Sequence, residues 1–126
     1  MKNLTKNYEI NVKPQLVYEA LTSQETFANW SEQPAEMVTE VHGTFSQFGG
    51  NIVGVFLAIH PNKIVQKWKE KNWVDFSHVT FSITEKNSNT MLEIKHNDIP
   101  DEHFEQIKNG WDAYYVGPLK KFLEKK

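Results

Sequence analysis

The sequence contains no cysteine, no long apolar run and no excess of basic residues. Without cysteine the chain has neither a disulfide framework nor thiol chemistry, which fits a reducing compartment. The N-terminus lacks the apolar core of a signal peptide, and no apolar run approaches membrane-spanning length. A formal net charge of −2 argues against a dedicated nucleic-acid binder, which would be basic. We therefore expect a soluble cytoplasmic protein with no nucleic-acid or membrane partner.

The residue patterns that mark catalytic and cofactor sites are also missing. The five histidines show no His-x-x-x-His spacing, and no serine follows the nucleophile-elbow pattern. The pair Gly49-Gly50 belongs to a hairpin turn rather than to a phosphate loop. Carboxylates at Asp101, Glu102 and Glu105 are explained by the positive end of a helix dipole. The sequence thus predicts no enzyme, no cofactor and no metal site.

Aromatic residues make up 13% of the chain, and several of them fall on one C-terminal helix. Between Asp101 and Leu123, apolar residues recur every three or four positions, as in an amphipathic helix. Its predicted inward face consists of Phe104, Ile107, Trp111, Tyr114, Tyr115, Pro118, Leu119 and Phe122. Gly117-Pro118 should kink or loosen its last turns. A helix of this length requires a wide apolar surface to cover.

Upstream of this helix, apolar residues alternate with polar ones, which is typical of strands with one buried face. We expect strands near residues 8–12, 37–41, 45–48, 52–59, 64–68, 79–84 and 92–96. Two short helices should follow the first strand, one opening at Pro14 and the other capped by Ser23. Hairpin-length loops between the later strands indicate an antiparallel meander. The predicted fold class is α+β, with a curved antiparallel sheet wrapped on a long C-terminal helix in a single domain spanning residues 1–126.

The junction between sheet and helix is the first candidate site, because it would enclose a hydrophobic cavity. The predicted cavity lining is Phe56, Gln66, Trp68, His96, Trp111 and Tyr115. For the aromatic residues the alternative is plain core packing. For His96 the alternative is a core histidine with satisfied hydrogen bonds.

A second candidate site surrounds Trp73, which lies in a polar loop beside Lys67, Lys69 and Lys71. An exposed tryptophan next to basic residues would suit a partner whose surface is acidic. The alternatives are that Trp73 folds back onto the sheet edge with Phe76 and that the lysines form a solvated strand face.

Several stretches resemble the C-terminal domain of the activator of heat-shock protein 90 ATPase, within the START and birch-pollen-allergen helix-grip superfamily. Val17-Tyr18-Glu19-Ala20-Leu21-Thr22 with Trp30 is similar to the opening helices of the activator-like group. Gly50-Asn51-Ile52-Val53-Gly54-Val55-Phe56 resembles its Gly-Asn…Gly-x-Phe strand. The segments that resemble the chaperone activator in particular are Ile64-Val65-Gln66-Lys67-Trp68 with Trp73 and Phe76, Ile99-Pro100, and Gly110-Trp111-x-x-Tyr114-Tyr115.

The resemblance implies a cochaperone-type protein that binds heat-shock protein 90 and favours its closed, ATPase-active state. In the full-length activator a separate N-terminal domain docks on the chaperone's middle domain and supplies most of the stimulation. These 126 residues do not contain that domain. One alternative is a carrier or sensor of a small hydrophobic ligand in the cavity. Another is an enzyme of the cyclase or dehydratase kind found elsewhere on this fold, which would need His96 as its ionisable group.

Overall fold

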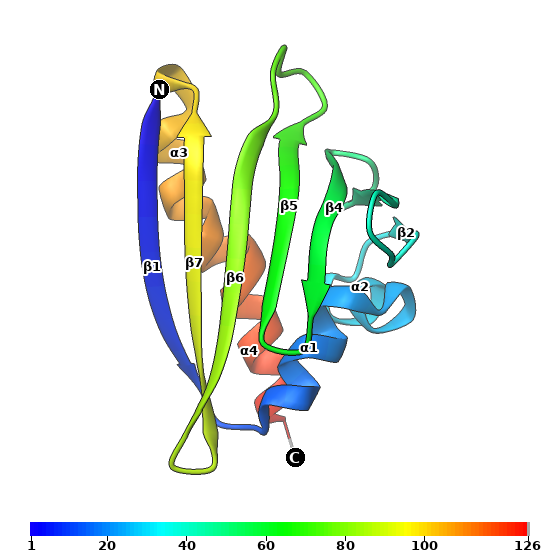
Figure 1. Ribbon diagram of the computed structural model, residues 1–126, viewed down its shortest axis with the longest axis vertical. Coiled ribbons are helices and arrows are strands. Elements are labelled where there is room, and N and C mark those ends of the chain that lie inside the picture. The colour runs from blue at the N-terminus through cyan, green and yellow to red at the C-terminus, as the bar shows by residue number, and fades with distance from the viewer. Residues whose placement is uncertain (126) are drawn as a thin grey trace.

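The computed structural model describes residues 1–125, and within them seven strands form one antiparallel sheet in the order β1-β7-β6-β5-β4-β3-β2. The strands are β1 (Lys2–Ile10), β2 (Glu36–Met37), β3 (Thr44–Gln47), β4 (Ile52–His60), β5 (Lys63–Glu70), β6 (Ser77–Lys86) and β7 (Asn89–Ile99). Strands β2 to β7 follow one another as a meander, and β1 pairs with β7 (Figure 1). The predicted α+β fold with an antiparallel sheet is confirmed.

Two short helices, α1 (Pro14–Thr22) and α2 (Gln24–Ser31), follow the first strand as predicted. Pro14 is in the first turn of α1, where its missing N–H and fixed φ cost little. Ser23 caps α2, because its Oγ accepts the Thr26 N–H at 3.2 Å. The indole N–H of Trp30 donates to the Ala20 carbonyl at 2.8 Å, so the two helices are held together by a buried hydrogen bond.

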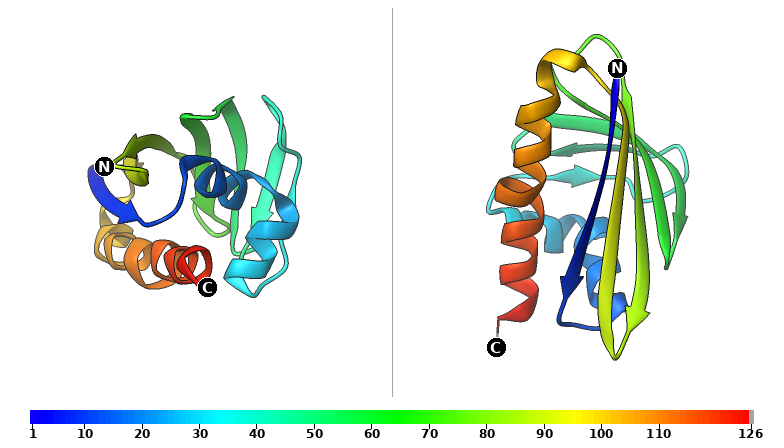
Figure 2. Two further views of the ribbon diagram at one scale, coloured as in Figure 1. Left: turned by 90° about the horizontal axis from the view of Figure 1, so that it is seen from below. Right: turned by 90° about the vertical axis from the view of Figure 1, so that its left-hand side faces the viewer.

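The long C-terminal helix lies along the concave side of the sheet, which curves around it (Figure 2). It consists of a 3₁₀ turn η1 (Asp101–His103), α3 (Phe104–Gly110), a π-helical segment η2 (Trp111–Val116) and α4 (Gly117–Glu124). The core fills the space between this helix, α1, α2 and the inward residues of the strands. A register shift between Phe56 and Ala58 marks a bulge in β4, and bulges of this kind bend a strand.

The π-helical segment has a local cause in the sequence. Pro118 has no N–H to donate, and in an ordinary α-helix its ring would clash with the preceding turn. The Gly117 N–H instead donates five residues back, to the Asp112 carbonyl. A Cβ atom on Gly117 would lie only 2.5 Å from that oxygen, so glycine suits this position. The loosening predicted for the last turns thus occurs as a wider turn before Pro118, whereas the last turns themselves, in α4, are α-helical.

The wider turn also explains two errors in the predicted helix face. Each residue of a π-helix advances by a smaller angle than in an α-helix, so residues after Trp111 rotate relative to the α-helical pattern. Tyr114, predicted to point inward, is 74% exposed, whereas Val116 is buried. Near the end of the helix, Phe122 is 40% exposed rather than buried as predicted.

The strand predictions fail at two places near the edges of the sheet. The strand expected over residues 37–41 ends at Met37, because the chain turns where the N–H of Gly43 donates to the Glu40 carbonyl. The first strand begins at Lys2, earlier than its alternation suggested, and ends before Val12. Within residues 1–125, no helix is both long and apolar enough to cross a membrane.

Candidate functional site

A cleft of about 630 Å³ opens between the C-terminal helix and the sheet. The end of α2, the β3–β4 hairpin, the end of β5 and the helix residues around η2 all contribute to it. Its lining includes Gln33, Phe48, Asn51, Ile52, Trp68, Lys71, Gln106, Ile107, Trp111, Tyr114, Tyr115 and Pro118. The volume is within the range of small-molecule sites, and the mixture of aromatic walls with amide side chains is typical of them.

Stacked aromatic rings form one wall of the cleft. The rings of Trp68 on β5 and Trp111 on η2 stack with centroids 5.7 Å apart and planes inclined by 29°. Tyr115 packs against Trp111 at 4.7 Å and against Phe48 of the hairpin at 5.8 Å. Tyr114, the exposed residue of η2, stands at the rim. The π-helical segment therefore supplies three aromatic residues to this cleft, and such segments are frequent at functional sites.

Behind Trp111 a fully buried histidine forms a complete set of hydrogen bonds. The indole N–H of Trp111 donates to His96 Nδ1 at 3.0 Å, which leaves the proton of the neutral ring on Nε2. That Nε2–H donates to Ser77 Oγ at 2.7 Å, and Ser77 donates in turn to the Trp68 carbonyl. Burial, and secondarily the charge of His78, lowers the pKa of His96 to about 3, so the ring is neutral at physiological pH.

Close to this histidine, a second group of buried polar atoms has no hydrogen-bond partner within residues 1–125. It comprises both amide atoms of Gln66, the indole Nε1 of Trp68 and the hydroxyl of Tyr115. Burial raises the pKa of the Tyr115 hydroxyl well above its usual value, so this group is neutral. Unpaired polar atoms inside a protein are uncommon because they lose their water without gaining a partner.

The cavity predictions are met in part. Trp68, Trp111 and Tyr115 do line the cleft, whereas Phe56, Gln66 and His96 are not among its lining residues and lie fully buried in the core. His96 takes the alternative that the sequence left open, a core histidine with satisfied hydrogen bonds. The sequence missed Phe48 as a wall residue, although its position just before the Gly49-Gly50 turn was visible. It also missed the rim position of Tyr114, which depends on the π-helical turn.

The interpretation of Trp73 as an exposed anchor is wrong, because its side chain is only 5% exposed. The ring stacks on His103 at 5.3 Å and packs edge-on against Trp68 at 5.8 Å. Lys69 Nζ donates to the Trp73 carbonyl at 2.9 Å and thereby ties down the loop. Trp73 thus folds inward, as the alternative proposed, but Phe76 does not accompany it.

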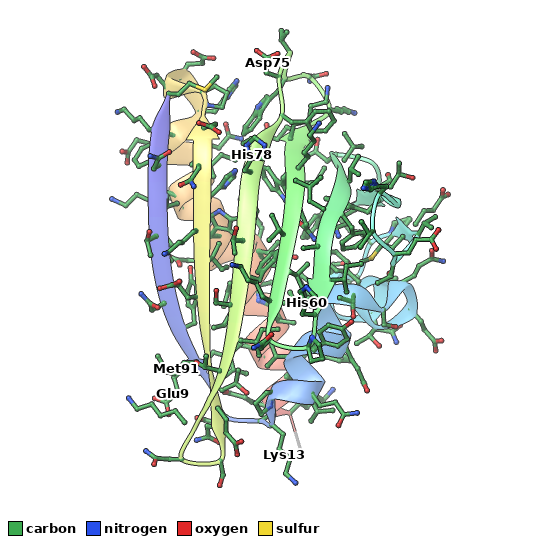
Figure 3. All side chains as sticks on the ribbon, viewed as in Figure 1. Glu9, Lys13, His60, Asp75, His78 and Met91 are labelled. Atoms are coloured by element: carbon green, nitrogen blue, oxygen red, sulfur yellow. The ribbon has the colours of Figure 1, made fainter. Side chains whose placement is uncertain are left out.

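The three neighbouring lysines do not form one patch either. Lys67 and Lys69 lie on the outer face of β5, where their Nζ atoms are 5.9 and 5.4 Å from the centroid of the Phe76 ring. Lys71 lies past the end of the strand and lines the cleft instead. On the neighbouring strand β6, the His78 side chain also belongs to the outer face (Figure 3), and its Nδ1 lies 3.0 Å from an Asp98 carboxylate oxygen. The structure therefore replaces the predicted tryptophan-lysine patch with a smaller one, Lys67-Lys69-Phe76, which we call the outer patch.

A polar contact fixes η2 to the edge strand on the other side of the helix. Asp112 accepts from Lys6 Nζ at 2.8 Å and from the Tyr8 hydroxyl at 2.5 Å. The hydrogen bond from Lys6, followed by that from Tyr8, lowers the pKa of Asp112. Among the described residues, no three His, Cys, Asp or Glu side chains converge as metal ligands would.

Comparison with known proteins identifies the family of this chain. The family described as "Activator of Hsp90 ATPase homolog 1-like protein" matches residues 11–124. The chain belongs to this family. Its relatives include the human activator of 90 kDa heat shock protein ATPase homolog 1, 32% identical over 110 residues, and the yeast Hsp90 co-chaperone Aha1 from Saccharomyces cerevisiae, 24% identical over 119 residues.

Those alignments cover 85% and 87% of this chain but only 32% and 34% of the human and yeast relatives. The chain therefore spans about a third of the length of these curated family members. A solved structure of similar size, an Hsp90 activator from Plasmodium falciparum, superimposes with a TM-score of 0.90 at 32% identity and covers 98% of this chain and 96% of its own. The predicted resemblance to the activator family and its helix-grip fold is thus confirmed.

Proposed function

We propose that this protein binds heat-shock protein 90 and favours the closed state in which that chaperone hydrolyses ATP. The observation that carries the proposal is the family match over residues 11–124, together with an Hsp90 activator of the same fold and similar length. The proposal assigns the ATP chemistry to the chaperone and assigns no catalytic residue to this chain. It also implies that the protein works in the cytoplasm, as the sequence analysis expects.

The mechanism that we propose is differential binding. A protein that binds the closed chaperone more tightly than the open one shifts the population toward the closed state by the ratio of the two affinities. No contact with ATP is needed for this effect. Because the chain corresponds to a third of its curated relatives, how far it raises the ATPase rate by itself is a separate quantity from how tightly it binds.

For the contact surface we propose the outer patch. Lys67 is exposed, and the Phe76 ring lies against the ends of Lys67 and Lys69. Beside the lysines, Val53 and Val55 pair with Lys69 and Lys67 across the β4–β5 ladder and add half-buried apolar surface to the same face. Basic groups around an aromatic and aliphatic centre suit a partner surface that is acidic with an apolar core.

The test is calorimetric titration of this protein into heat-shock protein 90 with and without a non-hydrolysable ATP analogue. We expect binding that strengthens with the analogue, because the analogue populates the closed state. The double variant Lys67→Glu with Phe76→Ala should bind about tenfold more weakly. Lys86→Glu, which makes the same charge change at the β6–β7 turn, far along the sheet from Phe76, is the matched control (Figure 1).

The outcomes separate the function from the surface. Absence of binding in both nucleotide states would reject the proposed function. Binding that the double variant leaves unchanged would reject only the outer patch. A loss of binding in Lys86→Glu as large as in the double variant would mean that overall charge, rather than this patch, governs the association.

A second candidate function is the binding of a small ligand in the cleft. It is favoured by the volume of about 630 Å³ and by the aromatic wall of Trp68, Trp111 and Tyr115. A helix packed flush against the sheet would have removed this candidate, but the cleft is present. This function is compatible with chaperone binding, since the cleft and the outer patch lie on opposite faces of β5.

A further inference from the structure

Gln66 is the least expected residue of the interior. It occupies the middle of β5, pairs with Phe56 on β4 and Val79 on β6, and is 0% exposed. Neither its amide oxygen nor its amide nitrogen has a hydrogen-bond partner among the residues that the structure describes. A leucine or methionine of similar size would fill this position without losing any hydrogen bond to water. Core packing alone therefore does not explain a glutamine here.

Among the other buried groups without a partner in the described residues, the Trp68 indole and the Tyr115 hydroxyl belong to walls of the cleft, whereas Gln47 and Trp73 are not among its lining residues. Trp68 follows Gln66 by two residues, so both side chains are on the inward face of β5. Tyr115 comes down from η2 and packs against Trp111 and against Phe81 of β6. Trp68 and Tyr115 line the cleft, while Gln66 lies deeper. Two of the three side chains thus form walls of an opening that leads to solvent, and Gln66 lies on the same strand face as one of them, Trp68.

We propose that the cleft and Gln66 form one binding site for a small, uncharged, planar molecule whose polar head is a carboxamide or a closely similar group. This inference rests on the second candidate function and names the chemistry of its ligand. The sequence predicted a purely hydrophobic ligand, whereas the unpaired groups call for an amphipathic one.

The donors and acceptors determine the head group. The Trp68 indole can only donate, so the ligand must present an acceptor. The Gln66 amide both donates and accepts, and a second amide satisfies it in both directions. The Tyr115 hydroxyl can serve either role. A charged head is disfavoured, because the unpaired groups are all neutral and the charged lining residues Glu70 and Lys71 belong to the outer end of β5 and the loop beyond it.

The aromatic wall determines the body of the ligand. Trp68 and Trp111 present nearly parallel rings, and a flat apolar body would pack against such rings through offset stacking. The unpaired atoms are closed off from solvent in this conformation, so entry requires a wall residue to move.

The experiment titrates three naphthalene probes of similar shape into the isotope-labelled protein. Binding of each probe is monitored by two-dimensional amide NMR. The probes are 2-naphthamide, 2-naphthoate and 2-methylnaphthalene. We expect 2-naphthamide to shift the resonances of cleft residues and to bind about tenfold more tightly than the other two. In Gln66→Leu this preference should disappear, and 2-naphthamide should bind no better than 2-methylnaphthalene. Gln15→Leu, the same substitution at an exposed position of α1, is the matched control and should keep the preference.

A second variant keeps the test decisive if Gln66→Leu does not give a folded spectrum. Tyr115→Phe removes one hydroxyl and should weaken 2-naphthamide about threefold while leaving 2-methylnaphthalene unchanged. Equal binding of all three probes in the unaltered protein, or a preference that Gln66→Leu and Tyr115→Phe leave undiminished, would overturn the carboxamide site but leave ligand binding in the cleft intact. Absence of shifts at the cleft with every probe would overturn both. Neither result bears on chaperone binding, which calorimetry tests separately.

Discussion

Two buried polar clusters lie next to each other on the concave face of the sheet, and their hydrogen bonding is opposite. In the first, which we call the His96 cluster, Ser77, His96 and Trp111 pair all of their side-chain polar groups. In the second, the Gln66 cluster, Gln66 and the polar atoms of Trp68 and Tyr115 are unpaired within the described chain. Val79 separates the two, because it pairs with Gln66 on one side and with His96 on the other.

The comparison teaches that burial alone does not distinguish structure from function. Gln66 and His96 are both 0% exposed. A paired cluster returns the hydrogen bonds lost to water and links elements, here η2 to β6 and β7. An unpaired cluster only loses them, so a protein retains it at the expense of stability. The first cluster is therefore expected to hold the fold together and the second to serve binding.

The largest predicted effect is on the paired cluster. His96→Leu would leave the Trp111 N–H and the Ser77 hydroxyl with fewer partners inside the core, so the free energy of unfolding should fall by about 3 kcal/mol. Chemical denaturation monitored by tryptophan fluorescence would measure this change. His60→Leu, at the exposed end of β4, is the matched control and should change stability by less than about 0.5 kcal/mol. A loss in His96→Leu no larger than in the control would break the comparison.

The pH dependence of stability gives the next largest effect. The pKa of His96 is about 3 in the folded protein and 6.5 as its ordinary value, so between these values the unfolded chain binds a proton that the folded chain does not. Stability from this residue is fully present above pH 6.5 and falls as the pH drops, by about 1.4 kcal/mol per pH unit well inside the window. The difference in stability between the unaltered protein and His96→Leu should therefore shrink from pH 7 to pH 4.

That difference isolates His96 from the other groups that titrate in the same range. The pKa values of Asp112 and Glu124 are lowered by their hydrogen-bond partners, so both carboxylates also cost stability in acid. They are common to both proteins and cancel in the difference. Parallel stability curves across this range would show that His96 is not held neutral.

The Gln66 cluster should respond in the opposite direction. Gln66→Leu removes two unpaired polar atoms from the core at nearly constant volume, so it should raise the free energy of unfolding by about 1–2 kcal/mol. Thermal and denaturant unfolding would both detect it. Gln15→Leu on the surface of α1 should leave stability within about 0.5 kcal/mol. A clear loss of stability in Gln66→Leu would mean that Gln66 is paired in solution and that the contrast between the clusters does not hold.

Much of the architecture could be predicted because it depends on local patterns. Alternation in 64–68 and 92–96 placed Gln66, Trp68 and His96 on the inward face, and the capping signal at Ser23 marked the start of α2. The α-helical pattern failed at η2, where the Gly117 N–H donates to the carbonyl five residues earlier. The resulting π-helical turn rotates Tyr114 outward and Val116 inward. The local patterns also failed at Lys2 to Asn7, where a largely polar segment forms a strand only because β7 offers it an edge.

The site was less predictable than the fold, because it depends on contacts between residues that are distant in the sequence. Sequence parity placed Gln66 and His96 on one face but could not show that Trp111 and Ser77 reach His96 while nothing in the described chain reaches Gln66. Loop residues were hardest, because Trp73 and Phe76 lie three positions apart and end on opposite sides of the sheet. The single-domain boundary, the partner-binding role of the lysines and the ligand remain predictions.

The smallest predicted effect compares two tyrosine hydroxyls and sharpens the contrast most closely. Tyr8 donates to Asp112 across the surface of the helix, so Tyr8→Phe should lower the free energy of unfolding by about 1 kcal/mol. Tyr115 donates to no described group, so Tyr115→Phe should leave stability unchanged or raise it by up to about 1 kcal/mol. The same atom is removed from the same residue type, but Tyr8 is half-buried and donates a hydrogen bond, whereas Tyr115 is buried and donates none to the described chain. If both variants lost the same stability, the Tyr115 hydroxyl would have a partner in solution, and the argument that the Gln66 cluster is kept for a ligand would lose one of its three members.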